Sequence, residues 1–202
     1  AQQLRIAAAD ISGVLPLMKV SDHLTWLAEV IIAQVVELAW QQMLQRYGMP
    51  ANATADDKGL AVIAYDKLGG WELGYGSDLD LVFVHSCDSQ APTSGERAID
   101  SKQFYLKLVQ RVLHLCTTRT NSGVLYDIDT RLRPNGSAGF LVTSLDSFRK
   151  YQFREGDNAA WVWEHQALTR ARFAAGNLQV APQFDAIRSD VLSQGRDVNA
   201  LR

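Results

Sequence analysis

A glycine-rich segment that runs directly into a pair of aspartates constrains the fold of this chain more than any other feature. The segment covers residues 69–84 and reads Gly-Gly-Trp-Glu-Leu-Gly-Tyr-Gly-Ser-Asp-Leu-Asp-Leu-Val-Phe-Val. Its apolar end predicts a buried strand, and alternate residues of a strand lie on one face. Asp78 and Asp80 should therefore point the same way. Two carboxylates that close repel each other unless a cation lies between them, so the segment predicts a metal site.

Apolar periodicity predicts an α/β (α+β) fold, with a small sheet and flanking helices. Predicted helices cover residues 22–47, 101–118, 144–151 and 157–175, and predicted strands cover 60–65, 79–85, 124–130 and 140–143. Ser21 or Asp22 can cap the first of these helices, and Ser144 can cap the third. We expect residues 1–150 to form the core with its N-terminal helices, and residues 151–202 to form a helical C-terminal segment. The chain reads as a truncated part of a longer protein.

Composition excludes several classes of protein. The 202 residues carry 20 Lys+Arg against 22 Asp+Glu, and a net charge of -2 predicts no general attraction to nucleic acid or to an anionic membrane. No uninterrupted apolar run approaches the roughly 20 residues that span a bilayer. Cys87 and Cys116 form no C-x-x-C pair, which argues against a zinc site and favours a reduced, cytoplasmic protein.

A second D-x-D pair, Asp127 and Asp129, lies on the predicted strand over residues 124–130. If this strand neighbours the first aspartate strand, either Asp127 or Asp129 can join Asp78 and Asp80. Hard carboxylate oxygens of this kind suit Mg²⁺ or Mn²⁺. Such metals can bridge a triphosphate and stabilise an in-line displacement. A lone D-x-D is more often a solvated loop, but the preceding glycines and the following strand favour a nucleotide site.

Several residues near the aspartates could contact phosphate. Arg131 and Arg133 alternate just after Asp129, and arginine matches phosphate geometry, although either could form an ordinary surface ion pair. The backbone of Gly69 and Gly70 and the hydroxyl of Ser77 could also approach phosphates, or serve only the turn. No G-K-[ST] sequence follows, so the segment is not a Walker loop.

The predicted late helix gathers aromatic, arginine and other polar residues. They could clamp a base or a protein partner, although a packed aromatic face with a salt-bridged polar face is the simpler explanation. The residues are Trp161, Trp163, Glu164, His165, Gln166, Arg170 and Arg172.

Three blocks of sequence resemble one family. Residues 67–81, from Lys67 to Leu81, resemble the nucleotidyltransferase signature of bacterial glutamine synthetase adenylyltransferase. Residues 129–134 look like its second signature, and residues 163–172 look like a third. The blocks occur in the family's order. Residues 19–27, together with 71–75, are more similar to the C-terminal, adenylylating copy of the domain.

The resemblance implies a polymerase-β-like nucleotidyltransferase fold that transfers AMP from ATP to a tyrosine of glutamine synthetase and releases pyrophosphate. It implies that Asp78, Asp80 and Asp129 are both catalytic residues and ligands of Mg²⁺ or Mn²⁺. Gly69, Gly70, Ser77, Arg131 and Arg133 would then bind the nucleotide. Its implied partners are glutamine synthetase and, in the full-length enzyme, a nitrogen-signalling PII protein.

Two alternatives remain open at this point. The same fold could remove AMP from glutamine synthetase by phosphorolysis, or the domain could be a non-catalytic regulatory module. Asp66 departs from the family, which usually has a small residue before Lys67. We expect the Asp66 carboxylate to face solvent, because it would repel a triphosphate if it faced inward.

Overall fold

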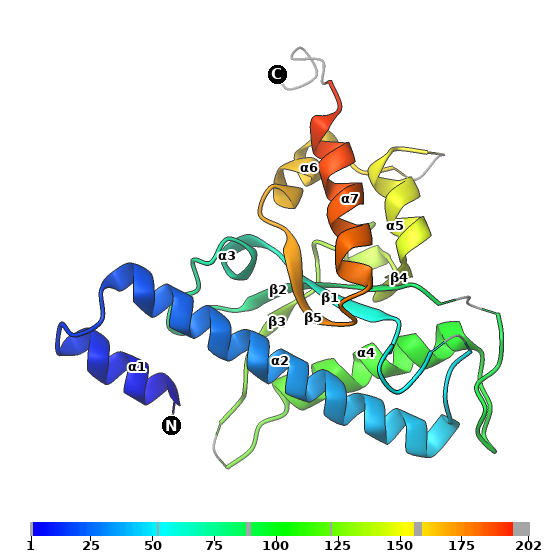
Figure 1. The fold of residues 1–202 in the computed structure, drawn as a ribbon, viewed down its shortest axis with the longest axis horizontal. Coiled ribbons are helices and arrows are strands. Elements are labelled where there is room, and N and C mark those ends of the chain that lie inside the picture. Colours follow the sequence, from blue (N-terminus) through cyan, green and yellow to red (C-terminus); the bar gives the residue numbers. More distant parts are fainter. Residues whose placement is uncertain (1, 52, 88–89, 122, 156–158, 196–202) are drawn as a thin grey trace.

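The computed structural model describes residues 2–51, 53–87, 90–121, 123–155 and 159–195, and the side chains of Val162 and Trp163 lie outside this description. Helices and strands alternate along most of the chain (Figure 1). Their order is α1 (Gln2–Ile11), α2 (Leu17–Tyr47), β1 (Leu60–Ala64), α3 (Asp66–Gly69), β2 (Leu79–His85), α4 (Ser101–Thr117), β3 (Ile128–Asp129), a 3-10 turn (Gly136–Ala138), β4 (Val142–Ser144), α5 (Leu145–Gln152), α6 (Val162–Leu168), β5 (Arg172–Gly176) and α7 (Val180–Ser193).

The sheet is small and mixed, as the α/β prediction requires. Its strand order is β3-β2-β1-β5, and β4 also pairs with β2. β1 is antiparallel to both β2 and β5, whereas β3 and β4 run parallel to β2. β3 pairs with the first residues of β2 and β4 pairs with its last three. The two ends of β2 therefore have different neighbours.

Helices cover both faces of the sheet (Figure 1). Leu81 and Phe83 of β2 pack into the core that α2 and α4 share with the sheet. Val82 and Val84 point the other way, into a second core with α5 and α7. A strand that is buried on both faces needs apolar residues at consecutive positions, which explains the uninterrupted apolar run after Asp80.

The long helix α2 is a core helix of this fold. By length and composition alone it is, within the described part of the chain, the single helix that could cross a membrane. Of its most apolar window, 44% is buried inside the protein, against the sheet and α4. Passing the criteria of length and composition is weak evidence for a membrane span, because core helices of globular proteins pass them too.

Some predicted boundaries are confirmed and others are wrong. β2 and α4 match their predicted ranges closely, and Ser144 caps α5 by accepting a hydrogen bond from the backbone N–H of Ser147. The first long helix begins at Leu17, after Pro16, rather than at the predicted Ser21 or Asp22. Proline favours the start of a helix because its nitrogen has no hydrogen to leave unpaired.

The predicted helix over residues 157–175 is wrong in its second half. α6 ends at Leu168, and residues 172–176 form β5, which pairs antiparallel with β1. The pairing continues past a register shift between Val62 and Ile63. Only the neighbouring strand makes this segment extended, so local periodicity could not reveal it. The boundary near residue 150 between core and C-terminal segment stays a prediction.

Candidate active site

Strand pairing brings Asp80 beside Asp129. β2 and β3 run parallel, and their register pairs Leu79 with Ile128 and Asp80 with Asp129. The backbone N–H of Leu79 also donates to the carbonyl oxygen of Asp127, at 2.9 Å. Side chains of directly paired residues lie on the same face of a sheet. The two carboxylates therefore share one face, at the end of the sheet where β2 begins.

Asp78 and Asp127 lie one residue before β2 and β3 respectively, and both are exposed. They line an open cleft together with Asp129 and Arg131. Asp78 thus reaches the site from the turn rather than from the strand itself. The sequence leaves a choice between Asp127 and Asp129, and the register places Asp129 beside Asp80 while Asp127 stays outside the pair.

Asp80 has the most perturbed carboxylate at this end of the sheet. Its pKa is raised to about 6, first because burial disfavours the charged form and then because Asp78, Asp129 and Asp66 carry like charges nearby. Lys67 opposes this rise only weakly, as the last and smallest contribution. Negative charge therefore accumulates here beyond what the surrounding protein neutralises.

Asp66 lies at the mouth of the cleft, where its side chain stays 46% exposed, so the expectation that it faces solvent holds only in part. It lines the same cavity as Asp80 and Arg170. The Arg170 guanidinium balances it, with Nη1 3.4 Å from Asp66 Oδ1 and Nη2 donating to Glu72 Oε2 at 2.5 Å. The backbone of Asp66 is in the left-handed region, with φ of 45°. Arg170 thus makes an extra carboxylate tolerable at the mouth of the site.

Arg131 binds Asp129 from two directions. Its backbone N–H donates to Asp129 Oδ1 at 2.7 Å, and its side-chain Nε donates to Oδ2 at 2.6 Å. Nη2 forms an ion pair with the same Oδ2. These hydrogen bonds hold the pKa of Asp129 below its usual range. The Arg131 side chain is 76% exposed, so it can move away from Asp129 without disturbing the core.

Arg133 holds the loop that follows β3. Its guanidinium donates to the carbonyl oxygens of Thr130 at 2.7 Å, Ser137 at 3.2 Å and Gly139 at 3.3 Å. Arg133 also lines the cleft beside Arg131. Three backbone acceptors define a role in shaping the loop, which is separate from the phosphate contact that the sequence predicts for it.

Comparison with protein families decides what kind of chain carries this geometry. A family model described as glutamate-ammonia ligase adenylyltransferase (GlnE) matches residues 1–187. The chain belongs to this family. Its members are nucleotidyltransferase enzymes, and the small mixed sheet with flanking helices agrees with a nucleotidyltransferase-like fold. The family assignment that the three sequence blocks suggest is confirmed.

In this adenylyltransferase-family chain, the turn that contains Gly69 and Gly70 packs tightly against Arg170 and Arg172. Gly69 is buried, and a Cβ there would overlap the carbonyl oxygen of Arg170. Arg172 donates to the carbonyl oxygens of Leu68 at 2.9 Å and Gly69 at 3.1 Å. Gly70 borders the Arg170 side chain. Packing alone therefore requires glycine at position 69, whether or not this residue also approaches a phosphate.

Ser77 closes the second half of the turn. Its hydroxyl oxygen accepts a hydrogen bond from the backbone N–H of Gly74 at 3.2 Å, and its own N–H donates to the carbonyl oxygen of Gly74. Ser77 thereby fixes the chain immediately before Asp78. The Ser77 hydroxyl hydrogen takes no part in this contact and remains available as a donor.

The family implies ATP as substrate and typically a divalent metal. Among the described residues, no three acidic, histidine or cysteine side chains already stand in a common coordinating arrangement. The donor set nevertheless fits Mg²⁺, because Asp78, Asp80 and Asp129 supply hard oxygens, and burial together with the neighbouring carboxylates raises the pKa of Asp80. Arg131 donates to both oxygens of Asp129, to Oδ1 through its backbone N–H and to Oδ2 through its side chain, so a metal at Asp129 would compete with these contacts.

The sequence did not single out Glu29 and Trp71 as partners of the site. Glu29, on α2, forms an ion pair with Arg172, and the Arg172 guanidinium lies 4.5 Å from the Trp71 ring centroid. Together these contacts join α2, the glycine turn and β5. No local signal could have found these contacts, because Glu29 and Trp71 each lie about a hundred residues or more before Arg172 in the sequence.

Proposed function

We propose that this chain transfers AMP from ATP to a tyrosine hydroxyl of glutamine synthetase and releases pyrophosphate. The observation that carries the proposal is the direct pairing of Asp80 with Asp129, with Asp78 at the adjoining turn. Family membership supports the reaction class. The likeness of residues 19–27 to the adenylylating copy supports this direction of transfer.

In the proposed reaction, the tyrosine oxygen forms a bond to the α-phosphorus of ATP, and the bond to the β-phosphate oxygen breaks. Asp78, Asp80 and Asp129 would hold Mg²⁺, which supplies neutralisation of the phosphate charge. Asp129 would also accept the tyrosine proton. Ser77 and the backbone of Gly70 would orient phosphate oxygens, and Arg131 would pair with them after leaving Asp129.

The alternative direction uses the same residues. Phosphate would attack the phosphorus of the AMP–tyrosine linkage, and ADP would leave while the tyrosine oxygen recovers a proton. A regulatory, non-catalytic module is the third candidate, and a nitrogen-signalling PII protein is its proposed partner. Retention of all three carboxylates favours catalysis over this third role.

The test compares Asp80→Asn with Asp127→Asn. Both variants remove one carboxylate of a D-x-D pair, but only Asp80 faces Asp129. With α-labelled ATP and unmodified glutamine synthetase, Asp80→Asn should lose label transfer by about 100-fold or more, while Asp127→Asn keeps it. Equal activity in the two variants would refute the assigned site. ADP release from adenylylated glutamine synthetase and phosphate, without forward transfer, would select the reverse reaction.

A further inference from the structure

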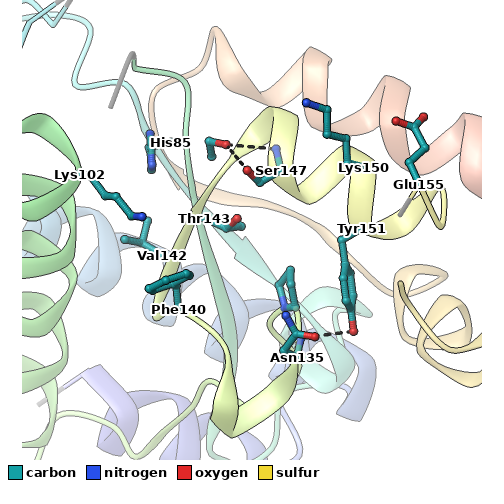
Figure 2. A pocket seen from close by; sticks show the side chains of 12 residues that line it. His85, Lys102, Asn135, Phe140, Val142, Thr143, Ser147, Lys150, Tyr151 and Glu155 are labelled. Atoms are coloured by element: carbon teal, nitrogen blue, oxygen red, sulfur yellow. Dashed lines mark hydrogen bonds between the residues drawn. The ribbon is translucent and has the colours of Figure 1, made fainter. Parts of the chain in front are cut away.

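The two ends of β2 border different cavities. The cavity beside α5 has a volume of about 390 Å³ and is bordered by His85, the last residue of β2 (Figure 2). Lys150 and Glu155 in its wall already form ion pairs with residues of α5. The cavity at the other end, of about 440 Å³, is bordered by Asp80, one of the three carboxylates of the proposed site. A cation in this second cavity therefore lies where it can act on the substrate of that site.

Arg170 supplies such a cation, from the turn between α6 and β5. The same side chain lines a neighbouring cavity together with Gly69 and Gly70. Arg170 thus stands between Asp80 and the glycine turn that we expect to approach phosphate. Arg131 lines a different cleft, so the two arginines border the aspartates in separate cavities.

The hold on the Arg170 guanidinium is weak. Its partners are two carboxylates, with Nη1 3.4 Å from Asp66 Oδ1 and Nη2 donating to Glu72 Oε2 at 2.5 Å. These carboxylates are 46% and 61% exposed. The Arg170 Nε is buried and has no hydrogen-bond partner among the described residues, so the two terminal nitrogens alone hold the group. Exposed ion pairs contribute little stability, and a more highly charged anion can replace such partners.

The neighbouring arginines are held by backbone instead. Arg172 donates to two carbonyl oxygens of the glycine turn, and Arg188 donates to two at the end of α6. If either guanidinium moved to a ligand, it would leave backbone acceptors without their donors. The printed contacts of Arg170 are to side chains, so it can exchange them without disturbing the backbone.

We propose that Arg170 is a phosphate-binding residue of this site, and that it leaves Asp66 and Glu72 to pair with the triphosphate of the nucleotide. Phosphate oxygens match the two parallel N–H groups of a guanidinium, and a triphosphate carries several negative charges. Asp66 and Glu72 compete with phosphate for this guanidinium. The inference rests on the proposed function for the identity of the substrate.

Competition predicts opposite effects for the arginine and its acidic partner. Arg170→Met removes a ligand of the phosphate, whereas Glu72→Gln removes a competitor. If the ion pair only supported the glycine turn, breaking it from either side would have the same effect. Glu72 suits this test better than Asp66, because Asp66 is among the charges that act on Asp80.

The experiment is titration calorimetry of the chain with magnesium tripolyphosphate. Arg170→Met should weaken binding about tenfold or more, and Glu72→Gln should tighten it about threefold. Arg119→Met, at an exposed position beyond α4, should bind like the wild type. Unchanged binding in either of the first two variants, weaker binding in Glu72→Gln, or no binding by the wild-type chain overturns the inference. If Arg170→Met fails to fold by circular dichroism, the sign of the Glu72→Gln effect decides.

A double variant separates direct competition from a general change of charge. In the Arg170→Met background, Glu72→Gln should leave tripolyphosphate binding unchanged, because the guanidinium that it would release is absent. An equal gain in both backgrounds would mean that Glu72 repels the anion at a distance, and would overturn the inference. Label transfer is a separate test. AMP transfer by a chain whose tripolyphosphate binding ignores Arg170 would refute this inference alone, whereas binding through Arg170 without transfer would refute the proposed function alone.

Discussion

Asp80 and Asp129 lie directly opposite each other on β2 and β3, yet the protein shifts their pKa values in opposite directions. Burial and neighbouring carboxylates raise the pKa of Asp80 to about 6. Hydrogen bonds from Arg131 lower the pKa of Asp129. Asp80 is therefore partly buried among like charges, whereas the charge of Asp129 is already balanced by Arg131.

Replacing Asp80 by Asn should stabilise the metal-free protein near neutral pH. The folded-state pKa of Asp80, about 6, lies above its ordinary value of 3.8, so its contribution to stability is complete below pH 4 and is lost as pH rises through 6. At pH 7 the Asn variant should gain about 1–2 kcal/mol in urea unfolding with EDTA present.

The control for this prediction is the pH itself. Near pH 3 the wild-type carboxyl is largely protonated in both the folded and the unfolded state, so the stabilities of wild type and Asp80→Asn should converge. Asp127→Asn, an exposed position outside the strand pair, should change stability little at either pH. A stability difference that stays constant across the pH range would mean that the ionisation of the partly buried Asp80 carboxyl is not its cause.

Removing the Arg131 side chain should release Asp129 for metal binding. Arg131→Met in the nucleotide-free protein is expected to tighten Mn²⁺ binding a few-fold, because Asp129 Oδ2 loses its competing side-chain donors while the backbone N–H at Oδ1 stays in place. The same variant should weaken ATP binding if Arg131 turns to the phosphates. Titration calorimetry with Mn²⁺ and with Mn²⁺–ATP measures both effects. Arg119→Met, at an exposed position, is the matched control, and weaker Mn²⁺ binding in Arg131→Met would contradict the prediction.

Sequence alone predicts the parts of this fold that depend on local pattern. β2 and α4 are amphipathic or apolar over their whole length, so their ranges follow from periodicity. If two predicted strands are neighbours, the sequence brings one aspartate of the second D-x-D pair to Asp78 and Asp80, but only the register of β2 and β3 selects Asp129 over Asp127. β3 itself is shorter than predicted, with two residues, because in the parallel register residues 124–127 lie opposite the turn that precedes β2 rather than opposite β2 itself.

What the sequence could not predict depends on contacts between distant segments. Arg133 was predicted to meet phosphate, and its backbone partners become evident only when the loop at residues 134–139 is folded. Asp66 was expected to face solvent, and Arg170, which balances it, lies about a hundred residues later. Scattered histidines gave no reason to single out His85, whose unpaired nitrogen results from the stacking of β2 on α4.

The two glycines of the first turn should respond differently to alanine. A Cβ at Gly69 meets the backbone oxygens of Arg170 and Ala64, which cannot move without distorting β5 or β1. A Cβ at Gly70 mainly meets the flexible end of the Arg170 side chain. Gly69→Ala should cost about 3 kcal/mol or more in urea unfolding, and Gly70→Ala about 1 kcal/mol or less.

This pair also separates packing from nucleotide binding. If Gly70 approaches a phosphate, Gly70→Ala should weaken ATP binding in calorimetry although its stability is nearly normal. Similar losses of stability in the two variants would show that the close approach of Gly69 to Arg170 is not the reason why this turn requires glycine.

Acid should destabilise the protein through His85. Burial, with repulsion from Lys102 as a smaller cause, lowers the pKa of His85 to about 4 from an ordinary 6.5. Because the folded-state pKa is depressed, this contribution is complete above pH 6.5 and is lost as pH falls through 4, to a total of roughly 3 kcal/mol.

His85→Phe keeps a ring against Tyr105 and cannot be protonated. The stability of wild type relative to this variant should therefore fall by that amount between pH 7 and pH 4, and this comparison cancels the opposite effect of Asp80, which both proteins share. Parallel pH profiles of urea unfolding in the two proteins would contradict a buried, neutral His85.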